Sequence, residues 1–360
     1  MILLNPGPVN VSPRVTAAMS RGDLCHREPE FQTLLDSVRV KLVRALAPDG
    51  DWVAVPLTGS GTLALEAGVT SVVSSGRRML VVVNGVYGER ILEMAQTHGI
   101  ATVVVRSDWG RPPDLAAIEN ALRADPGIEV VALVHHETTT GLLNPVEAVG
   151  RIARAHGRVL FVDAISGLAG DTLRLEEWGV GVCVGVANKC VQGIPGIGFV
   201  LTKRSEMQRM AEIPPRSVYM HLPRHFAAHE KHTVPFTAAV QVLYALDEAL
   251  DELLEEGVDA RVARYGRAAA QLRAGFERLG LKLMLPPELR SNSITTLSLP
   301  QGLTYQQLHD RVRKDGFVIY EGQGQLSTQV FRVANMGALS RDDFARFLVS
   351  LERAMGGASA

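Results

Sequence analysis

One lysine stands at the end of an apolar stretch in the middle of the chain. The valine-rich run at 184–188 leads into Lys189, and a turn rich in glycine and proline follows it. Burial disfavours an ammonium ion, so a lysine at the end of a buried strand loses its proton easily and becomes a nucleophilic amine, which suits Schiff-base chemistry. The alternative, which taken alone is the commoner case, is a lysine that extends its charge from a strand end to water.

Two further polar groups follow apolar segments. The turn Thr58-Gly59-Ser60-Gly61-Thr62 leads into a helix, whose free amides and two hydroxyls would cradle one phosphate. An ordinary tight turn with a helix cap is an equal alternative. Asp163 ends another apolar run, where it would either hold a pyridine nitrogen protonated or cap a helix.

Three more positions complete the set. Tyr87 lies between glycines and would stack on a planar ring or simply pack. The threonines at 138–140 follow a strand and could orient a ring substituent, whereas His135, His136 and Glu137 do not indicate a metal site, because neighbours in an extended segment point to opposite faces. Arg332 lies in an apolar strand and needs an anionic partner, either a substrate acid or an internal one. Together these groups are what pyridoxal phosphate requires.

The elements that must position these residues follow a regular order. Strands and amphipathic helices alternate from Trp52 to Asp163, which predicts an α/β fold with a mainly parallel sheet. Two long helices at about 236–256 and 259–279 lead to a smaller α+β unit. We expect a large cofactor-binding α/β domain at 15–240 and a small α+β domain at 241–360. Residues 1–14 are expected to be extended and to pack near the small domain, and 213–235 to be irregular.

Composition narrows the class of protein. The 360 residues are 46% hydrophobic and 21% charged with a net charge of -1, which suits a globular protein with a large core. No basic stripe indicates nucleic acid or a membrane surface, and no apolar run reaches the roughly 18 residues of a membrane span. The three cysteines form no CxxC pair, which favours a reducing compartment, and without a signal segment we expect the cytoplasm.

The motifs resemble those of a known family over almost the whole chain. The chain is similar to the fold-type I pyridoxal-phosphate-dependent aminotransferases of class V, in the branch with the alanine–glyoxylate and serine–glyoxylate aminotransferases. The matching segments are Asn5-Pro6-Gly7-Pro8, Gly59-Ser60-Gly61-Thr62, Asn84-Gly85-Val86-Tyr87-Gly88, Glu137-Thr138-Thr139-Thr140-Gly141, Val162-Asp163-Ala164, Ala187-Asn188-Lys189-Cys190 and Phe331-Arg332.

This resemblance implies a role for each site residue. The cofactor is pyridoxal 5'-phosphate, Lys189 is the catalytic Schiff-base lysine, and Arg332 grips the acidic group of the substrate. The other residues implied to hold the cofactor are Asp163 at the ring nitrogen, Tyr87 in the stacking position, Ser60, Gly61 and Thr62 at the phosphate, Thr139 (or Thr138) near the ring hydroxyl, and Thr233 reaching the phosphate from the partner subunit. Active sites shared in this way imply a homodimer. Arg27 would add a contact to a substrate dianion or would pair with Glu28 or Glu30.

The resemblance also implies a reaction. Within the branch, the Ala-Asn-Lys-Cys segment favours transamination of 2-aminoethylphosphonate with pyruvate, which gives phosphonoacetaldehyde and alanine. The alternative is an aminotransferase of the same fold that acts on a related aminophosphonate, or on alanine or serine with glyoxylate. A lyase or desulfurase is less expected, because Asn188 stands where such desulfurases have histidine. A phosphate-binding regulatory module without catalysis is disfavoured by Lys189 and Asp163.

Overall fold

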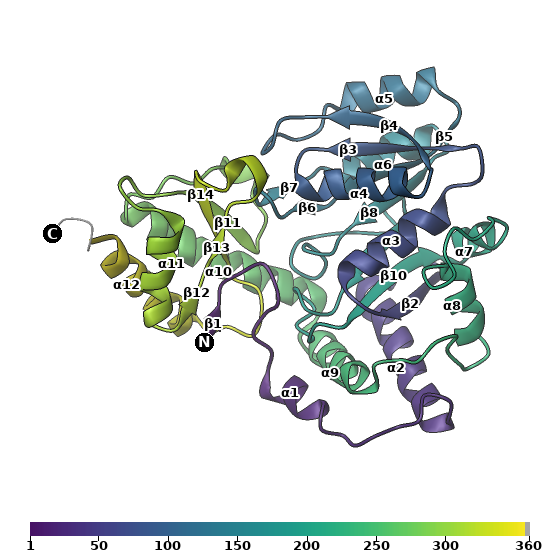
Figure 1. The fold of residues 1–360 in the computed structure, drawn as a ribbon, viewed down its shortest axis with the longest axis horizontal. Helices are drawn as coiled ribbons and strands as arrows, with labels where there is room; N and C mark the ends of the chain where they lie inside the picture. The colour runs from purple at the N-terminus through teal and green to yellow at the C-terminus, as the bar shows by residue number, and fades with distance from the viewer. Residues whose placement is uncertain (357–360) are drawn as a thin grey trace.

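A seven-stranded sheet forms the centre of the larger part of the molecule in the computed structural model, which describes residues 1–356 (Figure 1). The last four residues of the expected small domain, 357–360, therefore lie outside the described residues. The strand order is β2-β10-β9-β8-β5-β3-β4, and only β10 runs antiparallel to its neighbours. The strands are β2 (Trp52–Thr58), β3 (Arg78–Val83), β4 (Ala101–Arg106), β5 (Ile128–Val134), β8 (Val159–Asp163), β9 (Val180–Val186) and β10 (Ile197–Lys203).

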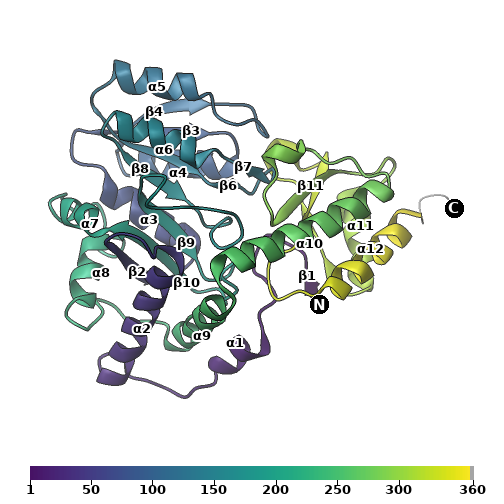
Figure 2. The ribbon, with the colours of Figure 1, turned by 180° about the vertical axis from the view of Figure 1, so that it is seen from behind.

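Helices cover both faces of this sheet, as the two opposite views show (Figures 1 and 2). Each face has its own buried apolar cluster, which is why the strands are apolar on both sides. One cluster includes side chains of α3 (Gly61–Val72), α4 (Val86–Thr97), α7 (Arg204–Ala211) and α8 (Leu222–His229). The other includes side chains of α2 (Pro29–Leu46), α5 (Leu115–Ala124), α6 (Val146–Ala155) and α9 (Val240–Glu256).

A three-stranded antiparallel sheet forms the smaller part of the molecule, in the order β11-β14-β13. Helices α10, α11 and α12 pack against it around a separate apolar cluster. Its elements are α10 (Val258–Arg278), β11 (Ile294–Ser298), α11 (Tyr305–Lys314), β12 (Phe317–Val318), β13 (Tyr320–Glu321), β14 (Val330–Ala334) and α12 (Arg341–Gly356), with short 3-10 helices at Pro287–Leu289 and Gly324–Leu326. A small hairpin of β6 (His136–Glu137) and β7 (Leu142–Leu143) lies beside it in Figure 1.

The N-terminal segment runs from this smaller sheet toward the larger one. β1 (Ile2–Leu3) pairs in parallel with β12, and the carbonyl of the fully buried Leu4 accepts a hydrogen bond from the amide of Ala334 at 2.7 Å. The chain then reaches α1 (Pro13–Ala18), where Arg14 pairs with Glu248 of α9 at 2.8 Å. The segment is thereby fixed at both of its ends.

The predicted fold class is confirmed, with two local corrections. Residues 1–14 are not extended throughout, because α1 begins at Pro13: the Ser12 side chain accepts from the amide of Val15, and proline suits the first turn of a helix. Residues 213–235 are not irregular throughout, because Pro223 likewise stands in the first turn of α8 rather than breaking a helix. Among residues 1–356, no helix has the length and apolar character needed to cross a bilayer.

Candidate active site

The carboxyl ends of neighbouring strands bring the predicted residues to one edge of the large sheet. Asp163 is the last residue of β8 and pairs with Val184 of β9, while Lys189 follows β9 after a short turn. β2 also ends at this edge, since Thr58 pairs with Ile197 at the start of the antiparallel β10. Such an edge of an open α/β sheet is the usual place for a ligand.

Lys189 is mostly enclosed. Burial lowers the pKa of Lys189 to about 8, with the charge of Arg332 acting in the same direction and that of Asp163 opposing it. Its ammonium donates to the backbone carbonyl of Pro6 in the N-terminal segment. A Cβ on Gly7 would lie 2.8 Å from Cδ of Lys189, and Gly7 has a φ of 101°, so only glycine suits this position.

Asp163 is buried and only partly satisfied. Its Oδ1 accepts from the amide of Ile165 at 3.0 Å, whereas its Oδ2 has no hydrogen-bond partner among the described residues. Burial raises the pKa of Asp163 to about 6. The unpartnered oxygen leaves room for a protonated nitrogen of a bound ring.

The N-terminus of α3 packs against the carboxyl ends of β8 and β9. Ser60 caps the helix by accepting from the amide of Leu63 at 3.3 Å. A Cβ on Gly61 would lie 3.1 Å from Cδ1 of Ile165 and 3.2 Å from Cβ of Val186. The first helical turn can approach the strand ends this closely because Gly61 lacks a side chain, which brings the free amides of a helix N-terminus to the sheet edge that carries Asp163.

Tyr87 lies in the first turn of α4, with a guanidinium over its ring. The Cζ atom of Arg90 is 4.7 Å from the ring centroid, and its Nη1 is 3.5 Å from the hydroxyl of Thr62. Burial raises the pKa of Tyr87, and a hydrogen bond with Gln323 opposes the rise. Sequence reasoning missed Arg90, although its position three residues after an expected stacking aromatic was a usable signal.

The threonines after β6 have separate partners. The hydroxyl of Thr139 donates to Glu137 at 2.5 Å and accepts from the amide of Val86 at 2.9 Å. The hydroxyl of Thr138 instead contacts that of Ser166 at 2.6 Å. Both threonines are buried, and the loop that carries them connects β6 to β7 and is hydrogen-bonded to the start of α4 through Val86.

Arg332 is fully buried on β14 without a carboxylate partner in the part of the chain that the structure describes. Its Nη1 donates to the carbonyl of Thr138 at 2.8 Å and to Gln323 at 3.0 Å, and its Nε donates to the carbonyl of Glu321 at 2.9 Å. Its Nη2 is buried and unpartnered. A buried guanidinium requires compensation of its charge, and no internal acid within residues 1–356 forms an ion pair with it, although the charges of Glu137 and Glu321 act on it from farther away.

Two predicted residues lie outside this group within the single chain. Arg27 is exposed in the loop between α1 and α2, which runs along the lower edge of Figure 1, away from β14. Among the described residues it pairs with neither Glu28 nor Glu30. Thr233 is half-buried after α8, where its amide donates to the carbonyl of Ala228 at 3.0 Å. No hydrogen bond within residues 1–356 joins either residue to the group around Lys189.

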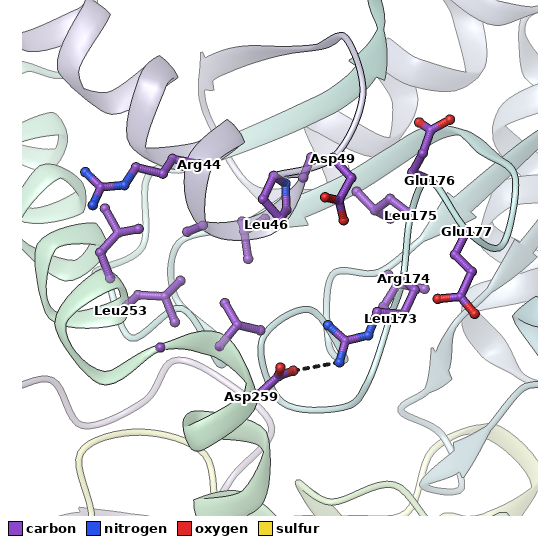
Figure 3. Close-up of a pocket in the computed structure, with 16 residues that line it drawn as sticks. Arg44, Leu46, Asp49, Leu173, Arg174, Leu175, Glu176, Glu177, Leu253 and Asp259 are labelled. Atoms are coloured by element: carbon purple, nitrogen blue, oxygen red, sulfur yellow. Dashed lines mark hydrogen bonds and ion pairs between the residues drawn. The ribbon is translucent and has the colours of Figure 1, made fainter.

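A separate cavity of about 270 Å³ lies between the end of α2, the loop at 173–177 and the α9–α10 junction (Figure 3). Two ion pairs lie at its wall, Arg174 with Asp259 at 3.0 Å and Glu176 with Lys203 at 2.8 Å, whereas Arg44, Asp49 and Glu177 form no ion pair among residues 1–356. None of the predicted site residues lines it. The predicted catalytic and cofactor-binding groups are therefore not part of this cavity.

Comparisons with known proteins agree on one family. A protein-family model described as "Aminotransferase class-V" matches residues 22–346 of this chain. A 2-aminoethylphosphonate–pyruvate transaminase of Vibrio vulnificus (strain CMCP6) is 36% identical over 360 residues, covering 98% of this chain and 97% of that protein. One from Bacillus cereus (strain G9842) is 34% identical over 357 residues with the same coverage.

Solved structures agree with this match. The pyridoxamine–pyruvate aminotransferase of Mesorhizobium loti has a TM-score of 0.92 at 29% identity, covering 100% of this chain and 93% of that one. The alanine–glyoxylate aminotransferase of Nostoc sp. has a TM-score of 0.92 at 27% identity, covering 98% and 95% of the two chains.

The lowered pKa of Lys189 predicts its reactivity. Acylation of Lys189 by a small reagent, followed by peptide mass spectrometry on the cofactor-free protein, should rise steeply as the pH passes about 8, because only the unprotonated amine reacts. A rate that remains negligible until above pH 10 would contradict the desolvated environment described here.

Proposed function

The chain belongs to the class-V aminotransferase family, and we propose that it transfers the amino group of 2-aminoethylphosphonate to pyruvate, giving phosphonoacetaldehyde and alanine. One observation carries the choice of an acidic substrate. Arg332 is fully buried, has no carboxylate partner among the described residues and keeps Nη2 free. A phosphonate has up to two negative charges and several acceptor oxygens, which suits a guanidinium.

Aminotransferases of this family use pyridoxal 5'-phosphate, and the residues of this chain fit that cofactor. The unpartnered Oδ2 of Asp163 is suited to the ring nitrogen, and the amides at Gly61 and Thr62 are suited to the phosphate, with Ser60 capping the same turn. Tyr87 is assigned to the ring face. When bound, the cofactor supplies an electron sink that stabilises negative charge on the substrate carbon.

Lys189 is assigned two tasks. Its unprotonated Nζ would hold the cofactor through a covalent bond, and as a free amine the same Nζ would accept a proton and return it. A pKa of about 8 suits both tasks, because the amine gains and loses a proton readily near neutral pH. Asp163, with a pKa of about 6, is largely ionised there and can stabilise a protonated nitrogen.

The remaining cofactor contact is assigned to Thr139, near the ring hydroxyl. Because its hydroxyl already donates to Glu137, it can offer only an acceptor oxygen there. Thr138 is the alternative residue for this contact, because its hydroxyl could rotate away from Ser166 and donate its hydrogen bond to the cofactor instead. Backbone carbonyls of Thr138 and Glu321 orient the guanidinium of Arg332, so that Nη2 is the atom presented to the substrate.

A panel of amino donors tests the proposal. With pyridoxal phosphate present, 2-aminoethylphosphonate and pyruvate should give alanine faster than serine and glyoxylate give glycine, because the aminophosphonate fulfils the charge requirement of Arg332. Lys189→Ala should abolish turnover and the cofactor mass fixed on the protein by borohydride. Faster turnover of small amino acids with glyoxylate, which an arginine could also bind through a carboxylate, would overturn the phosphonate assignment in favour of that alternative.

Replacing the buried arginine should act on substrate binding. Arg332→Gln removes charge-assisted bonds of about 1.5–3 kcal/mol, so the KM for 2-aminoethylphosphonate should rise roughly 10- to 100-fold. Steady-state kinetics measure this change. The control is Arg346→Gln, which should leave KM unchanged because the Arg346 side chain is exposed on α12. Equal KM values for the two variants would rule out Arg332 as the anion-binding group.

We also propose a homodimer with active sites shared between subunits, located in the cytoplasm. Val40 on α2 is 63% exposed and borders a groove of about 650 Å³ that also involves Trp52 and His232, next to Thr233. An exposed apolar side chain beside such a groove is typical of an association surface. Thr233 would then serve the phosphate of the partner subunit, with Arg27 available to its substrate.

The proposed location in the cytoplasm is supported by the three free cysteines among the described residues, which suit a reducing compartment.

Charge placed in that groove should separate the subunits. Val40→Glu should convert a sedimenting dimer into a monomer, because association would bury an unpaired carboxylate. Val349→Glu, at a 55% exposed position on α12, is the control and should remain dimeric. A wild-type monomer in sedimentation velocity, or a dimeric Val40→Glu variant, would refute this arrangement.

A further inference from the structure

Glu137 is a fully buried carboxylate to which no role has so far been given. It is the second residue of β6, and four hydrogen bonds converge on it. Its Oε1 accepts from the amide and hydroxyl of Thr139, at 3.1 and 2.5 Å, and from the amide of Tyr87 at 3.5 Å; its Oε2 accepts from the amide of Gly88 at 3.3 Å. No basic side chain within residues 1–356 forms an ion pair with it. Burial raises the pKa of this carboxyl, and the backbone and hydroxyl donors oppose the rise.

Two of these four donors belong to the first turn of α4. The first amides of a helix have no partner inside the helix, and a negative charge is favourable there. Glu137 takes the amides of Tyr87 and Gly88, and Thr139 takes that of Val86 at 2.9 Å. Glu137 and Thr139 thus cap three consecutive amides as one unit.

The chain makes room for this cap at Gly85. A Cβ there would lie 2.3 Å from Cδ of Glu137, so any side chain would displace the carboxylate. The capped turn carries Tyr87, whose ring is also held by Arg90 at 4.7 Å. The backbone and the ring of Tyr87 are thereby fixed from two directions.

We propose that Glu137 is a positioning residue, which fixes α4 so that Tyr87 is held ready against the ring of the cofactor. This inference rests on the proposed function, because it gives Tyr87 the stacking position. Glu137 contributes through the placement of Tyr87 and not by touching the cofactor. The conformational entropy of the aromatic ring is thus lost during folding, so that ordering the ring does not weaken the binding of the cofactor.

A carboxylate is required at this place and an amide cannot replace it. All four of its partners are donors, so glutamine would direct an NH2 group against other donors and leave at least one amide unpaired. Glu137→Gln, although nearly isosteric, should therefore behave as a disruptive substitution.

The neighbouring threonines provide a matched pair of variants. The Thr139 hydroxyl is part of the cap, whereas the Thr140 hydroxyl is buried without a hydrogen-bond partner. Valine has nearly the same shape as threonine, so Thr139→Val removes one member of the cap and Thr140→Val is the control for loss of a buried hydroxyl.

The test measures the dissociation constant of pyridoxal phosphate on the cofactor-free protein, with the melting temperature recorded for each variant. Glu137→Gln should weaken binding about 10-fold, Thr139→Val should weaken it several-fold and Thr140→Val should not change it. In a Tyr87→Ala background the effect of Glu137→Gln should disappear, because the residue through which it acts is gone.

Each other outcome overturns the inference. Unchanged affinity in Glu137→Gln, an equal effect of the two threonine variants, or a Glu137 effect that persists in full without Tyr87 would show that the cap does not act through the aromatic ring. If Glu137→Gln does not fold, Gly85→Ala in the two backgrounds gives the same decision, because its Cβ would displace the carboxylate and Gly85 has no assigned contact with the cofactor. Failure of the wild-type protein itself to bind pyridoxal phosphate would instead refute the proposed function, so the two failures are distinguishable.

Discussion

Desolvation of charge is the constraint on which the rest of the site depends. Lys189, Asp163 and Arg332 are held away from water, and backbone groups have to replace the solvation that each has lost. The replacement is incomplete: Pro6 contacts the lysine and Thr138 the arginine, yet Oδ2 of the aspartate and Nη2 of the arginine stay without partners. A protein tolerates such incomplete solvation where a ligand completes it, and the free atoms mark the directions from which a cation and an anion would bind most favourably.

The sheet topology explains why these charges meet. β8 and β9 are neighbours, so the residues that follow them leave the sheet side by side, and β10 returns antiparallel next to them. The helix after β2 can then approach only through small residues. Gly61 allows contact with the strand ends, and a Cβ on Gly198 would lie 2.8 Å from the carbonyl of Ser60. Close backbone packing, more than any single hydrogen bond, therefore sets where the amides of α3 point.

Local patterns in the sequence were sufficient for the strands and helices of the large sheet and for identifying Lys189 and Asp163 as strand-end residues, because these features depend on periodicity and on neighbours in the chain. The missing acid partner of Arg332 could not be predicted, since it depends on which segments pack around β14. The same is true of the cap formed by Glu137 on β6, because two of its donors, the amides of Tyr87 and Gly88, lie on α4 about fifty residues away in the sequence. Helix α8 was missed because residues 213–235 were expected to be irregular, although the first turn of a helix accepts a proline such as Pro223.

The attachment of the N-terminal segment has a consequence for how the protein is made. Residues 2–4 pair with β12 and with Ala334, which are synthesised much later than residues 2–4, and the same segment then covers Lys189. The large sheet, with its own apolar clusters, contains all the residues it needs well before that. Contacts between distant parts of a chain form late in folding. Lys189 would therefore stay uncovered in the nascent chain until β12 and β14 have been synthesised, and the pairing of residues 2–4 with these strands would be the event that closes the site.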